Sequence, residues 1–225
     1  MAALFKNRID AGERLAESLS WLERNQSRES RQQRVIVVAV PRGGVIVADV
    51  IASKLEVKLD IVVSRKIGSP YNPECAVGAV MPDGSYFLNQ EYQGDLQELT
   101  DYIRTQAYEQ FKEINRRLMS YRGSTDYDNE FEGRTVVLVD DGIATGATII
   151  ASAQWIKNKH HCKDLIIASP LAPEETINDL NRVANKVIIL YTPDPFIAIG
   201  RFYEEFDQVS DDEVKEIMKK YGYKV

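Results

Sequence analysis

The sequence predicts a single α/β domain built around a mainly parallel β-sheet. Three short apolar runs have the length of strands and lack the alternation of half-exposed strands, which indicates strands covered on both faces. Segments with the 3.6-residue spacing of helices separate these runs along the chain. Strands that alternate with helices form parallel sheets, and such sheets bind ligands at the carboxyl ends of their strands.

The first half of the chain is predicted to place two strands among helices and polar loops. Asp10 and Glu13 have capping-box spacing at the start of an amphipathic helix. Pro41-Arg42-Gly43-Gly44 ends the first apolar run. The expected elements are a helix over 10–25, a polar loop over 25–34, a strand over 35–40, a helix through Leu55, a strand over 58–63 and a loop over 64–75.

The second half continues the alternation. Pro82-Asp83-Gly84 suits the turn of a hairpin, Gly123 suits the end of a long helix, and Ser210 with Glu213 suits the start of the last one. The expected elements are hairpin strands over 76–81 and 85–88, a helix over 96–118, a surface loop over 122–133, a strand over 135–139, a loop over 140–148, a helix from Ile150, a strand over 165–168, a helix from Pro173, a strand over 187–190 and an irregular aromatic stretch over 192–208.

The composition excludes several classes of protein. Apolar residues make up 44% and charged residues 28% of the 225 residues, the balance of a soluble globular protein. A net charge of −6 disfavours broad binding to nucleic acid or to an anionic membrane. No apolar run approaches the ~20 residues that span a bilayer. Two cysteines, Cys75 and Cys162, form no disulfide framework, so we expect a cytoplasmic protein. From the charge and the short apolar runs, we expect neither nucleic acid nor a membrane as a partner.

The loop after the third strand carries the most informative motif. The strand runs into two adjacent carboxylates, Asp140 and Asp141, and then into the small-residue segment Gly142–Thr148 at the start of a helix. Small residues let a ligand approach the backbone, and a helix N-terminus attracts phosphate. The carboxylates would repel phosphate, but they suit hydroxyl groups or a cation. A phosphate with neighbouring hydroxyls describes a ribose 5-phosphate.

Two other phosphate-binding motifs do not match this loop. A P-loop needs Lys directly before its Ser or Thr, where this loop has Ala147. A Rossmann fingerprint needs three spaced glycines, and only Gly142 and Gly146 are present.

Residues Val136–Thr148 closely resemble the defining motif of the type I phosphoribosyltransferases, which is a hydrophobic strand, two acids and a small-residue Thr-Gly loop. The resemblance implies that Asp140 and Asp141 hold the 2- and 3-hydroxyls of 5-phosphoribosyl-1-diphosphate (PRPP). Mg²⁺ would arrive with PRPP near these acids, and no direct metal ligand is assigned. The 5-phosphate would be bound by the loop residues Ala144, Thr145, Gly146, Ala147 and Thr148.

Segments after the first two strands match the family's pyrophosphate site. Arg42 and Gly43 lie in its short pyrophosphate loop, where Arg can fork onto phosphate oxygens. Arg65 and Lys66 follow the second strand and are assigned to the same pyrophosphate. A flexible loop over about 64–84 would close over the reacting centre. The candidate catalytic residues are Arg42, Lys66, Asp140 and Asp141.

The aromatic stretch over about 192–209 is similar to the family's hood, which binds the base. Phe196 is the stacking candidate, with Ile197 beside it. The 6-oxopurine enzymes carry Asp in place of Ala144 and Lys in place of Ala147, so the acceptor stays open between purine and pyrimidine. The chain looks more like a group of bacterial phosphoribosyltransferases of undefined acceptor.

The resemblance extends from about Val35 to Gln208 and implies one domain over 1–225, with a core over about 10–192. Its sheet would be five-stranded, flanked by helices, a hood and a flexible loop. The implied enzyme of nucleotide salvage transfers ribose 5-phosphate from PRPP to a nitrogenous base and releases pyrophosphate. The alternative is a non-catalytic PRPP sensor. Such regulators usually add a DNA-binding module or a basic RNA face, and this sequence shows neither, so we favour the enzyme. Self-association into a homodimer is left open.

Overall fold

A computed structural model of the protein describes residues 3–23, 27–72, 76–89 and 99–225. Its centre is a five-stranded sheet with the order β2-β1-β6-β7-β8, and every neighbouring pair is parallel. The predicted five-stranded parallel sheet is therefore confirmed. The strands are β1 (Val35–Ala39), β2 (Lys58–Ile61), β6 (Thr135–Val139), β7 (Asp164–Leu171) and β8 (Lys186–Tyr191).

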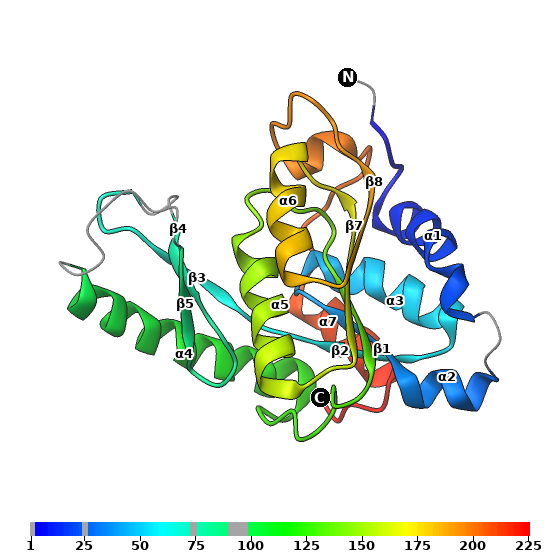
Figure 1. Ribbon diagram of the computed structural model, residues 1–225, viewed down its shortest axis with the longest axis horizontal. Coiled ribbons are helices and arrows are strands. Elements are labelled where there is room, and N and C mark those ends of the chain that lie inside the picture. Colours follow the sequence, from blue (N-terminus) through cyan, green and yellow to red (C-terminus); the bar gives the residue numbers. More distant parts are fainter. Residues whose placement is uncertain (1–2, 24–26, 73–75, 90–98) are drawn as a thin grey trace.

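Helices cover both faces of this sheet (Figure 1). Helices α1 (Arg8–Ser18) and α3 (Gly43–Leu55) pack on each other and on one face, while α5 (Ala147–His160) and α6 (Glu174–Val183) pack on the other. This division follows from the strand order, because right-handed crossovers that run outward from β1 and from β6 place their helices on opposite faces. The strand order reverses between β1 and β6, which is where ligands bind in open sheets.

A second, three-stranded antiparallel sheet extends away from the main one (Figure 1). It consists of β3 (Arg65–Gly68), β4 (Ala76–Val80) and β5 (Tyr86–Leu88). The long helix α4 (Thr100–Arg122) packs against it and ends at Gly123, as predicted. The hairpin is confirmed, whereas residues 65–68, expected within a loop over 64–75, form a strand instead, because their backbone pairs with β4.

Two expectations near the N-terminus are wrong. The first helix spans Arg8–Ser18 and is followed by the 3₁₀ turn η1 (Ser20–Glu23), and its N-cap is Asn7 instead of Asp10, because the Asn7 side chain accepts hydrogen bonds from two backbone N–H groups. The polar segment expected as a loop contains the helix α2 (Arg28–Arg34). Ser27 caps α2, and the Arg31 guanidinium donates to the carbonyl of Leu55, so tertiary contact stabilises this short helix.

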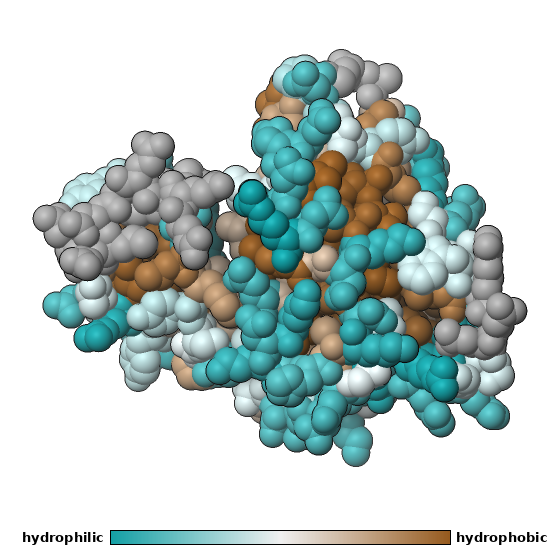
Figure 2. Space-filling model, in the orientation of Figure 1, coloured by the Kyte–Doolittle hydropathy of each residue, from teal (hydrophilic) through white to brown (hydrophobic). Residues whose placement is uncertain are grey.

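The C-terminal part follows the expected order. An aromatic stretch after β8 contains the 3₁₀ turn η2 (Ile199–Phe202), and α7 (Asp211–Lys220) begins with the predicted capping box of Ser210 and Glu213. Strand β8 forms one edge of the sheet, and the apolar side chains of 187–190 are only half-buried. Figure 2 shows apolar atoms at the surface in this region. Among the described residues, no helix is long and apolar enough to cross a membrane.

A buried ion pair joins the main sheet to α4. Asp60 of β2 is fully buried and accepts hydrogen bonds from Nε and Nη2 of Arg122 at 2.7 and 2.9 Å. Its Oδ1 also accepts the backbone N–H of Ile61 at 2.8 Å. The carboxylate charge is thus compensated inside the protein, as burial of a charge requires.

Candidate functional site

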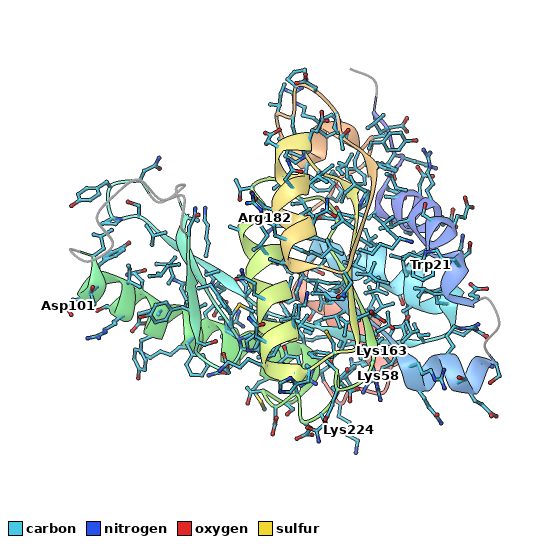
Figure 3. The ribbon with its side chains drawn as sticks, viewed as in Figure 1. Trp21, Lys58, Asp101, Lys163, Arg182 and Lys224 are labelled. Atoms are coloured by element: carbon cyan, nitrogen blue, oxygen red, sulfur yellow. The ribbon has the colours of Figure 1, made fainter. Side chains whose placement is uncertain are left out.

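The predicted site lies at the carboxyl ends of the strands. Figure 3 labels Lys58 and Lys163, which lie at the amino ends of β2 and β7, so the site lies at the opposite edge of the parallel sheet. Strands β1 and β6 pair in register from Val35 with Thr135 to Ala39 with Val139. The loops that follow these two strands therefore begin side by side at the point where the strand order reverses.

The acid pair follows β6 directly. Oδ1 of Asp140 accepts the backbone N–H of Asp141 at 2.9 Å, which fixes the first carboxylate over the turn. Burial raises the pKa of Asp140 well above its usual range, and the neighbouring negative charge of Asp141 raises it further. A carboxyl group with a strongly raised pKa next to a second carboxyl group is typical of a site for a ligand.

The turn after β1 lies directly against these acids. A Cβ atom on Gly43 would overlap Oδ2 of Asp141, and one on Gly44 would lie 3.0 Å from the Cα atom of Asp140. Glycine is needed at Gly43 because the carboxylate occupies the space that a side chain would need. The structure thus brings together two segments that lie about a hundred residues apart in the sequence, as predicted from the strand ends.

The small-residue loop runs from the acids into α5. Gly146 has φ 76° and is the N-cap of α5, a conformation that favours glycine, and it provides no side-chain cap. Ala144 and Thr145 are exposed, and Ala147 and Thr148 form the first, partly exposed turn of α5. Backbone N–H groups at a helix start without a side-chain cap can bind phosphate oxygens.

The candidate pyrophosphate residues lie in different surroundings. Nη1 of Arg42 lies 3.3 Å from Oδ1 of Asp211 at the start of α7, and the Tyr121 hydroxyl donates to the same oxygen at 2.5 Å. Arg65 donates to the side chain of Gln110 on α4, while Lys66, the next residue, is exposed on β3. Adjacent residues of a strand point to opposite faces, so Arg65 and Lys66 do not form one cationic pair.

The hood residues lie beyond β8. The ring of Phe196 is half-buried and packs against Phe202 with 5.4 Å between centroids. Ile197 is 71% exposed, so it does not belong to the core. A Cβ atom on Gly142 would lie 2.5 Å from Cγ2 of Ile199, so the hood packs closely against the loop that carries the acids.

Sequence reasoning missed the partner of the second acid. Nε of Arg8 lies 2.7 Å from Oδ2 of Asp141, and both side chains are 12% exposed. The two residues are 133 positions apart, and Arg8 lies in a stretch where charged residues recur every few positions. No local pattern distinguishes it from its neighbours.

Within the described part of the chain, no group of three His, Cys, Asp or Glu side chains gathers to hold a metal ion. The oxygens of Asp140 and Asp141 are nevertheless the hard ligands that Mg²⁺ prefers, and Mg²⁺ commonly keeps waters and phosphate oxygens as its other ligands. The acid pair therefore fits a magnesium ion that is bound mainly by a phosphorylated ligand.

Comparison with known proteins agrees with this geometry. Residues 7–190 match the phosphoribosyl transferase domain family. Proteins from two Mycobacterium tuberculosis strains, whose names assign them provisionally to the phosphoribosyl transferases, are 37% identical over 211 residues, 94% of this chain. The chain spans 45% of the length of these relatives. The crystal structure of TT1426 from Thermus thermophilus has a TM-score of 0.78 at 34% identity, with 98% of this chain and 99% of that one covered. This chain belongs to the phosphoribosyl transferase domain family.

Proposed function

We propose that the protein transfers ribose 5-phosphate from PRPP to a nitrogenous base and releases pyrophosphate. The observation that carries this proposal is the acid pair at the switch point, flanked by the turn at Gly43 on one side and by the start of α5 on the other. This arrangement offers hydroxyl acceptors between two phosphate-binding segments, which matches the order of groups along PRPP. Family membership supports the same substrate.

The proposed reaction exchanges one bond at C1 of the ribose. The bond from C1 to the diphosphate oxygen breaks and its electron pair leaves with the diphosphate, while a base nitrogen forms the new bond to C1 and then loses a proton. Asp140 and Asp141 orient the sugar through its hydroxyls, and the N–H groups at Ala147 and Thr148 anchor the 5-phosphate. Orientation and charge stabilisation of the leaving group account for most catalysis of this kind. Mg²⁺, when bound, would neutralise negative charge on the diphosphate.

The leaving group needs cations. Arg42 directly precedes Gly43, which lies against Asp141, and the Arg42 side chain is 31% exposed. In this proposal the guanidinium stabilises the charge that grows on the departing diphosphate, and Lys66 of β3 supplies a second cation. Removing one well-placed stabilising donor commonly costs ~10²–10³ in turnover.

A PRPP sensor without turnover is the second candidate. One observation favours it: Asp211 and Tyr121 form a cluster with Arg42, and Arg65 is held by Gln110. A protein that only holds PRPP does not need free cations beside the leaving group. An enzyme would have to release Arg42 from Asp211 on binding its substrate.

The experiment that separates these candidates measures pyrophosphate release from PRPP and Mg²⁺ across a panel of purine and pyrimidine bases. The enzyme predicts release that depends on one class of base. With that base, single-turnover rates of the Arg42→Ala variant should fall by ~10²–10³ while its PRPP affinity changes much less, because the cation acts on charge that develops in the transition state. Asp212→Ala, which changes an exposed carboxylate at the start of α7, is the matched control. PRPP binding without release for any base tried would favour the sensor.

A further inference from the structure

Arg8 is held in place by three separate contacts. Its Nε lies 2.7 Å from Oδ2 of Asp141, its Nη1 donates to the carbonyl of Asp207 at 2.8 Å, and its guanidinium carbon lies 3.8 Å from the ring centroid of Phe206. A planar guanidinium that is fixed on an aromatic face and by two acceptors has little freedom to turn. The arginine is therefore an ordered partner for the acid.

The segment before Arg8 is built into the hood. The backbone N–H groups of Leu4 and Phe5 both donate to the carbonyl of Phe202, at 2.8 and 3.0 Å, and the carbonyl of Phe5 accepts the N–H of Glu204 at 2.9 Å. The rings of Phe5 and Tyr203 lie 5.3 Å apart. These contacts join the N-terminal segment to the hood, so the two form one packed unit. Arg8 directly follows this N-terminal segment.

This unit contacts Asp141 in two places. Arg8 binds its carboxylate, and the Tyr203 hydroxyl, which is buried, donates to its main-chain carbonyl at 2.6 Å. Gly43 lies against Oδ2 of the same carboxylate, the oxygen that Arg8 binds, and a Cβ atom on Gly43 would lie 3.0 Å from Nε of Arg8. Side chain and main chain of the acid are thus both set by residues outside the PRPP motif.

We infer that Arg8 is a positioning residue that orients the carboxylate of Asp141 for the ribose hydroxyls. The inference rests on the proposed binding of PRPP. Arg8 engages Oδ2 of Asp141, and in this inference Oδ1 is the oxygen that accepts the ribose hydroxyl. The positive charge of Arg8 also lies beside two adjacent acidic side chains, which it stabilises together. Through Arg8, the position of the hood is linked to the geometry of the sugar site.

Arg14 provides a matched control on the same helix. It binds the carboxylate of Asp10 at 3.0 and 2.9 Å, donates to the carbonyl of Leu4 at 3.2 Å and lies over the Phe5 ring at 5.3 Å. Arg14 therefore repeats the three kinds of contact that Arg8 makes, with a carboxylate that is not part of the site. A role limited to anchoring the N-terminal segment would make the two arginines equivalent.

The test is calorimetric binding of ribose 5-phosphate, and separately of pyrophosphate with Mg²⁺, to the full chain and to Arg8→Met, Arg8→Lys and Arg14→Met. We expect Arg8→Met to weaken ribose 5-phosphate binding about 10- to 100-fold, the range for a lost hydrogen bond to a charged group. Pyrophosphate affinity should stay within about 3-fold of the parent value, and Arg14→Met should change neither affinity. Arg8→Lys should recover part of the loss, because it keeps the charge but not the planar fork.

Two results would overturn the inference. One is a folded Arg8→Met protein, judged by circular dichroism, that binds ribose 5-phosphate as the parent does. The other is a general loosening of the protein, seen as equal losses for both ligands or as the same loss in Arg14→Met. If Arg8→Met does not fold, Arg8→Lys decides, because full affinity in that variant would show that the fork is unnecessary. Failure of the transferase proposal has a different signature, since a sensor would show the same Arg8 dependence of binding without turnover.

Discussion

Two Asp–Arg pairs in this protein have the same chemistry and different surroundings. In the pair of Asp60 and Arg122, the side chains are 0% and 7% exposed, and the carboxylate receives two guanidinium hydrogen bonds as well as a backbone N–H. In the pair of Asp141 and Arg8, both side chains are 12% exposed and one guanidinium nitrogen reaches one oxygen. Both oxygens of the first carboxylate accept hydrogen bonds inside the protein, whereas Arg8 engages one oxygen of the second.

From this difference we infer that the first pair stabilises the fold, whereas the second pair belongs to the ligand site. Asp60 and Arg122 join the second strand of the main sheet to the helix that carries the small sheet, so their loss affects folding. Asp141 lies beside Asp140, whose ionised form the fold disfavours, and such an arrangement is retained where a ligand uses it. The predictions below test whether stability and ligand affinity divide between the pairs in this way.

The largest effect is expected from breaking the structural pair. Arg122→Met leaves the Asp60 carboxylate buried without compensation, so we expect a loss of about 3–5 kcal/mol in the free energy of unfolding. Urea denaturation of the parent and the variant measures it. The double change Asp60→Leu with Arg122→Met should recover much of the loss, because no charge is then buried. If Arg122→Met lost no more unfolding free energy than Arg8→Met, the two pairs would not differ in their contribution to stability, and this prediction would be wrong.

The next effect is on affinity. Asp141→Asn keeps the shape of the side chain but removes its charge, and we expect PRPP binding to weaken by about 1.5–3 kcal/mol, the range for hydrogen bonds to charged groups. Titration calorimetry with PRPP, ribose 5-phosphate and pyrophosphate resolves the effect by ligand. Ribose 5-phosphate should lose affinity as PRPP does, while pyrophosphate should not. Unchanged PRPP affinity in a folded Asp141→Asn protein would exclude this acid from the site.

The smallest effect concerns pH. Because burial and the charge of Asp141 raise the pKa of Asp140 in the folded protein, the folded state holds this proton more tightly than the unfolded state. The resulting stability is fully present below the unfolded carboxyl pKa of about 4 and is lost as pH rises through the raised pKa. Asp140→Asn cannot ionise, so it should be more stable than the parent at pH 8. Denaturation at pH 4 and pH 8 checks the sign, and a variant less stable than the parent at pH 8 would contradict it.

Sequence reasoning succeeded where a local pattern determines a local structure. The apolar runs of β1 and β6 need no distant partner to be recognised, and the acids and glycines that follow them are consecutive. It failed where tertiary contact overrides composition. Helix α2 is polar and depends on the contact of Arg31 with Leu55, and β3 has the composition of a turn but pairs with β4.

The supporting contacts of the site could not be predicted for the same reason. Arg8 reaches Asp141 because the N-terminal segment pairs with the hood, and Arg42, the N-cap of α3, reaches Asp211 because α7 packs beside α3. Each contact joins residues more than a hundred positions apart, which no spacing rule addresses. The motif thus identified the ligand-binding loop, while the fold identified what orients its side chains.

The central claim is that the acid pair and the loop before α5 bind PRPP, and thermal denaturation with and without PRPP and Mg²⁺ tests it most directly. At a PRPP concentration 100-fold above its dissociation constant, the parent protein should gain about 2.7 kcal/mol of stability, with a corresponding rise in melting temperature. At the same PRPP concentration, Asp141→Asn should gain much less. No shift with PRPP, or an equal shift with inorganic phosphate alone, would contradict the claim.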